Sequence, residues 1–310
     1  MARKGRRLRP IRFVTTNPFF APALIRKASG GVGITINVVY DLYPDALLSA
    51  GTVRPNSQLA KSLASITRYS FNQCDATVFI GDRIRQRAES LYGTPRRSFI
   101  IPIGADGRPF RNSPPILGSD LNTVTVMYCG QMGRMHDIDT IASAIASGQF
   151  HALRFVFRAS GAGYAELLRR VPSDARWEHG GALTTSEWQK AMLRAQIALV
   201  TMAEGAEDVA LPSKAYSALV AGQAILAICP SNSDLADLIR KHDCGWVVSP
   251  RDIGNLERIL KSVQSDRAEV QRKRINAFTA GHQYYDISII AKEWLNIIRE
   301  LDSQPSHRNG

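Results

Sequence analysis

The sequence predicts an α/β protein built on parallel, doubly wound sheets. Segments with a strand pattern alternate with helical segments of about ten to fifteen residues, which is the order expected of such a fold. Residues 224–228, AILAI, contain no polar residue, as expected for a parallel strand that is covered on both faces. With 310 residues and 45% hydrophobic content, the chain is long enough for two domains of ordinary size.

The first half contains expected strands that are separated by helices. The second of these strands is rich in β-branched residues, and Leu59, Leu63 and Ile66 recur at helical spacing in the longest helix. The expected strands are residues 11–16, 34–40, 76–80 and 98–103, and the expected helices are residues 21–28, 56–71 and 83–91.

A stretch typical of an interdomain linker separates the two halves. Pro, Gly, Ser and Asn are concentrated in residues 101–120, IPIGADGRPFRNSPPILGSD. We place the boundary near Pro115, which gives domains of residues 1–115 and 116–310. The second half is expected to have strands at residues 124–128, 153–157, 176–179, 197–202, 224–228 and 245–248, and residues 252–301 are expected to be helical.

Residues 211–228, LPSKAYSALVAGQAILAI, combine a helix start, a tight turn and a buried strand. Pro212 fits the first helical position, so Ser213 and Lys214 fall in the first turn, where backbone N–H groups and a lysine charge attract a phosphate. Gly222 is expected to end the helix because it adopts the left-handed conformation without steric cost. An ordinary βαβ crossover with solvated first-turn residues is the alternative.

A second candidate for phosphate binding follows the strand at residues 124–128. In CGQMGRMHD, Gly130 and Gly133 allow close backbone approach, and Arg134 offers a bidentate fork ahead of a helix that starts near Asp137. A glycine-bearing turn with a surface arginine is the alternative. A single histidine near a helix start, such as His136, is more often a cap or surface residue than a catalyst, and it could meet a phosphate only partly unless its pKa is raised.

Three other segments place polar residues or glycines after expected strands. Gly161 and Gly163 form a turn that could lie near a nucleotide base, although a lone Gly-x-Gly is also common in plain turns. An acidic loop, with Glu204, Glu207 and Asp208, follows residues 197–202. Asp41 follows residues 34–40, where it could act as a base toward a hydroxyl group or cap the next turn.

The chain carries a formal net charge of +12 and has an isoelectric point near 9.8. Six basic residues lie between Arg3 and Arg12, and Arg83, Arg85, Arg87, Arg96 and Arg97 form a second group. Such groups suit phosphate-bearing substrates or an anionic membrane surface. No RNA-binding aromatic motif, zinc finger or helix-turn-helix is recognisable, so nucleic acid is disfavoured.

The lack of a recognisable targeting signal and the pattern of the cysteines favour a cytoplasmic protein. No apolar run is long enough for a membrane span, and the basic N-terminus is not followed by the apolar core of a signal peptide. Cys74, Cys129, Cys229 and Cys244 match no metal-ligand spacing and are expected to be buried reduced thiols. Neither a metal nor a cofactor is expected.

The motifs resemble those of the family 4 retaining glycosyltransferases, in particular the bacterial surface-polysaccharide branch. Residues 211–228 are similar to PSK-x-Y…AG-x-x-I, CGQMGRMHD to GN-x-GR-x-HD, and YDLYPD to DLWPE, within a match from residue 11 to residue 301. The resemblance implies the GT-B architecture of two Rossmann-like domains. It also implies that a final helix, at about residues 284–301, crosses back onto the first domain.

The resemblance further implies transfer of a sugar, with retention, from a nucleotide-sugar to a glycan or lipid-linked acceptor. Arg134 and Lys214 would then stabilise the leaving diphosphate, and Asp41 would orient or deprotonate the acceptor hydroxyl. The donor-binding residues would be Gly130, Gly133, Arg134, His136, Gly161, Glu207, Pro212, Ser213, Lys214 and Ser217.

Two features depart from the family pattern. Val209 and Ser217 occupy the places of two glutamates, and Tyr40 replaces a histidine. Ser217 would make a weaker bond to a ribose hydroxyl than a glutamate, unless Glu207 substitutes. The first domain also has fewer expected strands than its relatives, which predicts an open sheet edge. A second chain, self-association or inactivity would follow from that truncation.

Two functions from other classes remain open. A non-catalytic or partner-dependent donor-binding subunit is favoured by Val209, Ser217 and the short first domain. A nucleotide-dependent oxidoreductase shares the α/β pattern, but no strand is followed by the full G-x-G-x-x-G fingerprint with an acidic residue about twenty positions later.

Overall fold

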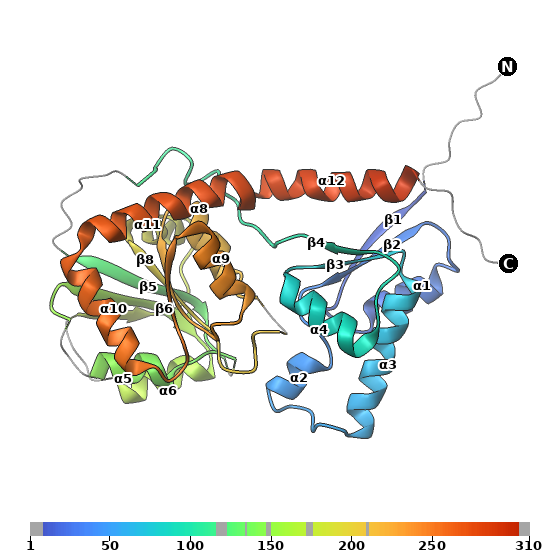
Figure 1. The fold of residues 1–310 in the computed structure, drawn as a ribbon, viewed down its shortest axis with the longest axis horizontal. Coiled ribbons are helices and arrows are strands. Elements are labelled where there is room, and N and C mark those ends of the chain that lie inside the picture. The colour runs from blue at the N-terminus through green and yellow to red at the C-terminus, as the bar shows by residue number, and fades with distance from the viewer. Residues whose placement is uncertain are drawn as a thin grey trace, which may run out of the picture. The chain divides into compact units, whose positions relative to one another are not determined.

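The computed structural model describes residues 9–115, 123–133, 135–146, 150–171, 176–208 and 211–303. The chain forms two compact units (Figure 1). The first unit comprises Met1–Pro102 together with Ala291–Gly310, and the second comprises Ile103–Ile290.

The first unit contains a sheet of four parallel strands in the order β1-β2-β3-β4. All four match segments that the sequence predicts to be strands. The elements of this unit are β1 (Ile11–Thr15), α1 (Ala21–Ala28), β2 (Ile34–Val39), α2 (Asp45–Ser49), α3 (Gln58–Gln73), β3 (Ala76–Phe79), α4 (Asp82–Tyr92), β4 (Ser98–Ile100) and, from Ala291 onward, α12 (Ile287–Ser303).

The two central strands, β2 and β3, are buried along their whole length and form the core of this unit. The later part of α12 packs beside β1. The Phe13 and Trp294 rings are 5.2 Å apart edge to face, and the Arg9 guanidinium donates to the Asp302 carbonyl oxygen at 3.0 Å. The C-terminal residues of the chain therefore belong to the unit in which the chain begins.

The second unit contains a sheet of six parallel strands. Its elements are β5 (Val124–Gln131), α5 (Asp139–Ala146), β6 (Leu153–Ser160), α6 (Ala162–Arg170), β7 (Trp177–Gly180), α7 (Thr185–Arg194), β8 (Ile197–Thr201), α8 (Lys214–Val220), β9 (Ala224–Ile228), α9 (Asp234–His242), β10 (Gly245–Val248), α10 (Ile253–Ser265), α11 (Arg267–Ala280) and the π-helix Gly281–Tyr285.

The strand order is β10-β9-β8-β5-β6-β7. From β5 the chain first adds strands on one side of the sheet, β6 and β7, and then adds β8, β9 and β10 on the other side, so the order of connection reverses between β5 and β8. Helices cover both faces of this sheet: α5 and α10 pack on one face, and α8, α9 and α11 pack on the other (Figure 1). In doubly wound sheets of this order, ligands bind beyond the carboxyl ends of the strands at the reversal point. The fold thus directs attention to the ends of β5 and β8.

The boundary between the units lies earlier than the predicted position near Pro115. Residues from Ile103 onward belong to the second unit because they pack into it. Phe110 is fully buried and lies 5.7 Å, edge to face, from the Trp188 ring, while the Ala105 N–H donates to the Tyr285 carbonyl oxygen at 2.9 Å. The Pro/Gly-rich composition indicates an irregular segment here, and this segment is packed against the second unit.

The helix after the acidic loop begins two residues later than predicted. Ser213 is the N-cap and Lys214 the first helical residue, so Pro212 precedes the helix instead of opening it. The predicted end of this helix at Gly222 is confirmed. Gly222 has φ +69°, and the Gln223 N–H donates to the Ala218 carbonyl oxygen at 3.0 Å, which closes the helix in a left-handed cap.

All four cysteines are free thiols, and Cys74, Cys229 and Cys244 are buried, as expected; Cys129 is only partly buried. Within the described ranges, none of the helices has both the length and the apolar character that a bilayer crossing requires.

A buried carboxylate joins α2 to α4 and offers a test of the first unit. Asp45 is 2% exposed and accepts hydrogen bonds from the Tyr92 hydroxyl and from the Arg87 guanidinium, at 2.9 and 2.7 Å for the latter. Asp45→Asn should lower the free energy of unfolding by about 2 kcal/mol, because the three hydrogen bonds from Arg87 and Tyr92 lose their charged acceptor. Urea denaturation measures this change. Asp82→Asn, at an exposed pair with Arg85, should cost below about 0.5 kcal/mol; equal losses in both variants would contradict the assignment.

Candidate functional site

Lys214 lies directly against the backbone at the end of β5. Gly130 has φ +123°, and a Cβ atom at this position would lie 2.8 Å from Lys214 Cε. Any other residue would therefore push the lysine stem away. Two residues that are 84 positions apart and that the sequence assigned separately to phosphate binding are thus brought together at the reversal point of the sheet.

The Lys214 ammonium group is partly buried and faces aromatic rings. Its Nζ atom lies 5.4 Å from the centre of the Tyr128 ring and 3.5 Å from Nε2 of His136. Burial lowers the pKa of Lys214. Within the described residues, no carboxylate forms an ion pair with this lysine. The site therefore holds a cation without a protein anion, which suits an anionic ligand.

His136 is held as a neutral hydrogen-bond donor. The Gly133 N–H donates to Nδ1 of His136 at 3.1 Å, so Nδ1 carries the lone pair and Nε2 carries the proton. Burial, followed by the charge of Lys214, lowers the pKa of His136 to about 4. The pKa of His136 is therefore lowered and not raised, and the neutral ring directs an N–H donor toward Lys214.

The two donors cannot bond to each other. Nε2–H of His136 and the Lys214 ammonium group each need an acceptor, and they are 3.5 Å apart. One ligand oxygen atom on the solvent side of these two groups would accept a hydrogen bond from each of them. Phosphate oxygens have the charge and the several lone pairs that such an arrangement requires.

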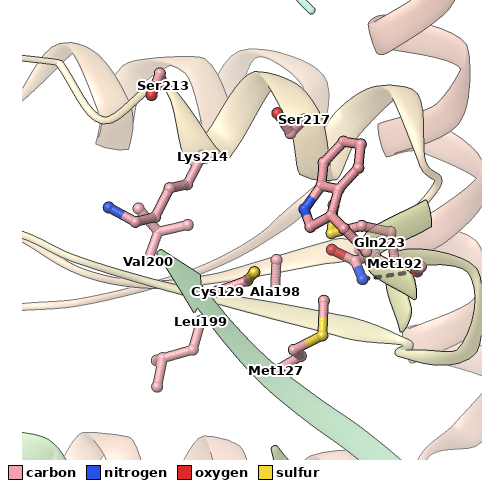
Figure 2. Close-up of a pocket in the computed structure, with 11 residues that line it drawn as sticks. Met127, Cys129, Met192, Ala198, Leu199, Val200, Ser213, Lys214, Ser217 and Gln223 are labelled. Atoms are coloured by element: carbon pink, nitrogen blue, oxygen red, sulfur yellow. Dashed lines mark hydrogen bonds between the residues drawn. The ribbon is translucent and has the colours of Figure 1, made fainter. Parts of the chain in front are cut away.

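A cavity of about 110 Å³ opens beside Lys214 and extends under α8 (Figure 2). Ser213, Lys214 and Ser217 line it from the helix, and Met127 and Cys129 line it from β5. Its remaining lining residues are Trp188, Met192, Ala198, Leu199, Val200 and Gln223.

Gln223 is the buried polar residue of this cavity. The residue is fully buried, and its Nε2 atom donates to the Met192 carbonyl oxygen at 2.8 Å. Its Oε1 atom is buried and has no hydrogen-bond partner among the described residues. A ligand or water with a donor group could therefore be held at this end of the cavity.

The glycine pair after β6 is a packing feature. Gly161 has φ +103°, and a Cβ atom there would lie 2.6 Å from the Met132 carbonyl oxygen; a Cβ atom at Gly163 would lie 2.7 Å from Ile138 Cδ1. The glycines let the start of α6 approach the segment that carries Gly133. The structure thus places Gly161 against Met132, and it is not among the residues that line the cavity beside Lys214.

The acidic loop is only partly described. Glu207 is half-buried, and its Oε2 atom is buried without a hydrogen-bond partner, whereas Glu204 pairs with Arg251. Arg134 and Val209 lie outside the described residues. Within the described ranges, no group of three or more His, Cys, Asp or Glu side chains could hold a metal ion.

Asp41 lies in the first unit, just after β2. It lines a cavity of about 10 Å³, enough for about one water molecule, together with Asn37, whose buried Oδ1 atom has no partner. Burial raises the pKa of Asp41. Its ionised form is therefore a stronger base than an ordinary aspartate.

Two site residues were not predicted from the sequence. Tyr128 was assigned to a strand core, where its ring in fact supports Lys214. Gln223 was given no role from the sequence. The signal was there, because a glutamine between Gly222 and a buried strand is unusual, but its function depends on the cavity that the fold creates.

No protein-family model matches this chain. A curated relative, the probable glycosyltransferase WbjE of Pseudomonas aeruginosa, is 26% identical over 252 residues, covering 77% of this chain. The chain spans 62% of the length of that relative.

Solved structures with the same fold align over a larger share of this chain. Sucrose-phosphate synthase from Thermosynechococcus elongatus aligns with a TM-score of 0.73 at 13% identity, covering 95% of this chain and 74% of that one. Anabaena HepE in complex with UDP aligns with a TM-score of 0.71 at 10% identity, covering 93% and 79%. These likenesses establish the fold: two parallel α/β sheets in the GT-B architecture.

The electrostatics of the site can be tested by NMR titration of His136. An ordinary histidine titrates near pH 6.5, whereas His136 should remain neutral until about pH 4. Lys214→Met should raise the pKa of His136, because it removes a neighbouring positive charge, but burial should keep it below the ordinary value. Lys261→Met, on the exposed face of α10, is the control. Titration of wild-type His136 near pH 6.5 would contradict the proposed tautomer and burial.

Proposed function

We propose that this chain is a glycosyltransferase that takes its sugar from a nucleotide-sugar donor. The observation that carries the proposal is the convergence of Lys214 and the His136 Nε2–H group at the sheet reversal point, both without an anionic partner in the part of the chain that the structure describes. The relative WbjE supports the activity, and HepE, which has been solved with UDP and with UDP-glucose, supports the donor class.

In the proposed reaction, cationic and neutral donors stabilise the diphosphate as it leaves the sugar. The Lys214 ammonium supplies charge, and His136 supplies a hydrogen bond from Nε2. Arg134, assigned from the sequence alone, would supply a bidentate contact. Sugar transfer with retention and a role in surface-polysaccharide synthesis follow from the sequence resemblance to family 4. Neither a metal nor a cofactor is part of this proposal.

The donor nucleoside would lie near the mouth of the cavity beside α8. Ser217 and Lys214 both line that cavity, so a ribose next to the diphosphate would meet the Ser217 hydroxyl group. Glu207 has a buried oxygen without a partner and is the proposed acceptor for a ribose hydroxyl. Ser217 and Glu207 would thus share the ribose contact that a glutamate at position 217 makes in the resembled family.

The acceptor would be a glycan or lipid-linked sugar, and Asp41 would orient or deprotonate its hydroxyl group. The raised pKa of Asp41 supports the second role, because a stronger base removes the proton more readily. We propose a location in the cytoplasm and peripheral binding to the inner face of the membrane.

A second candidate function is a donor-binding subunit without turnover of its own. Ser217 favours it, as does the length of the chain relative to WbjE. A thermal-shift screen against nucleoside diphosphates and their sugars, run beside a transfer assay, separates the two. A ligand at a hundredfold its Kd should add about 2.7 kcal/mol of stability. Stabilisation without transfer identifies the subunit, and the absence of any stabilisation contradicts both functions.

Charge removal at the proposed diphosphate site should reduce donor binding. Lys214→Ala and Arg134→Ala should each weaken binding or turnover at least tenfold, since a charge-assisted hydrogen bond contributes roughly 1.5–3 kcal/mol. Calorimetric titration with the nucleotide identified in the screen measures the effect. Lys261→Ala, an exposed lysine on α10, should bind normally. If both site variants bind like the wild type, the donor site lies elsewhere.

Membrane binding depends on basic residues, of which several are already paired. In the second basic group, Arg85 pairs with Asp82, Arg87 with Asp45, and Arg97 with Glu300. Arg9 pairs with Asp302, so we expect the other basic residues between Arg3 and Arg12 to contribute most of the attraction, at roughly 1 kcal/mol each near an anionic surface.

Flotation with vesicles tests this expectation. The protein should float with anionic vesicles at low salt, detach at high salt and ignore neutral vesicles. Replacing the six N-terminal basic residues with glutamine should abolish flotation, whereas Arg87→Gln should change it little. Absence of flotation at both salt concentrations would show that these charges serve another purpose.

A further inference from the structure

The cavity under α8 presents opposite hydrogen-bonding groups at its two ends (Figure 2). At its mouth, the Lys214 ammonium group is a donor that needs an acceptor. Its inner end, which we define as Met127, Trp188, Met192 and Gln223, holds the buried Oε1 acceptor of Gln223, which has no partner among the described residues. An ionised phosphate accepts hydrogen bonds and donates none. A phosphate therefore suits the mouth, and the inner end suits a different group.

The orientation of the Gln223 amide is fixed by the end of α7. Met192 lies in the last turn of that helix, where carbonyl oxygens have no partner within the helix. The Gln223 Nε2 atom donates to the Met192 carbonyl oxygen at 2.8 Å. Because a carbonyl oxygen only accepts, the nitrogen and not the oxygen of the amide must point to it. Oε1 is therefore the atom that remains for a ligand, and Gln223 is fully buried.

The walls of the inner end are apolar and suit an aromatic ring. Met127 and Met192 contribute two thioethers, whose sulfur atoms make favourable contacts with aromatic rings. The Trp188 ring is held edge to face by the Phe110 ring, at 5.7 Å between centres. A buried water typically makes about three hydrogen bonds. Among the described side chains of the inner end, Gln223 Oε1 is the single buried atom without a partner, so water would be poorly held.

We propose that the inner end of this cavity binds a small neutral molecule with one aromatic ring and one hydrogen-bond donor, such as a phenol. The donor would bond to Gln223 Oε1, and the ring would contact Met127, Trp188 and Met192. An apolar cavity of roughly 150 Å³ holds a benzene ring. A cavity of about 110 Å³ therefore limits the ligand to a single ring. The ligand is neutral because the cation of this cavity, Lys214, lies at the mouth. This inference does not depend on the proposed transferase activity.

Methyl NMR of the full chain tests the inference, because Met127 and Met192 place two methyl groups in the wall of the inner end. The probes are phenol and toluene, which have similar size and differ in the donor. Phenol should shift both methionine signals in a saturable manner, and Met132, which belongs to the core on the other face of the sheet, should not shift. Toluene is the more hydrophobic probe, yet it should bind no more tightly, because it leaves Gln223 Oε1 unsatisfied.

Two variants separate the hydrogen bond from the volume of the cavity. Gln223→Met keeps an unbranched side chain and removes the acceptor, so it should weaken phenol binding at least fivefold and leave toluene binding unchanged. Ala198→Val narrows the cavity and should weaken the binding of both probes at least fivefold. Gln58→Met, at an exposed glutamine of the first unit, should bind both probes like the wild type.

Three outcomes would overturn the inference. The first is that neither probe shifts the Met127 and Met192 signals in a saturable manner, which would leave water as the occupant. The second is that toluene binds the wild type more tightly than phenol does. The third is that Gln223→Met weakens the binding of both probes equally. If Gln223→Met does not unfold cooperatively, the order of the two probes on the wild type and the effect of Ala198→Val decide.

Discussion

The contact between Lys214 and the backbone at Gly130 is the constraint on which the candidate site depends. The lysine reaches the end of β5 because β5 and β8 are neighbours at the sheet reversal, and because the loop after β8 returns the chain as α8 above them. A single Cβ atom at Gly130 would displace the lysine stem. Strand order, helix position and one glycine therefore act together, and none of them alone would create a phosphate-binding geometry.

Burial determines how the charges of this site behave. In water, a lysine and a histidine 3.5 Å apart would both tend to be protonated at mildly acidic pH and would repel each other. Partial burial resolves the conflict: His136 gives up its charge, Lys214 keeps it, and the Gly133 N–H fixes the imidazole tautomer. The result is one charge and one neutral donor directed at the same region. The proposed anion site thus avoids the desolvation cost of two cations.

The sequence predicts the elements of this fold better than their contacts. The strands Ala224–Ile228 and Gly245–Val248 were predicted with their observed bounds, because continuous apolar runs are bounded by Gly and Pro. Strands β5 and β6 each run three residues further than predicted, since their polar ends still pair in register. The unit boundary was misplaced because composition does not reveal that Phe110 is buried. The histidine tautomer and the Gln223 cavity depend on residues distant in sequence, so no local pattern could have indicated them.

The partial burial of Cys129 has a practical consequence. Burial raises the pKa of the other three thiols to about 11 or 12, and they lie fully inside the two units, so neutral electrophiles reach them only through unfolding. Cys129 lines the cavity under α8 and is the accessible exception. A slow-reacting thiol reagent would therefore modify the native protein at one position, inside this cavity. The unaltered chain thus carries its own attachment point for a spectroscopic label, and occupancy of the cavity could be followed without introducing a cysteine.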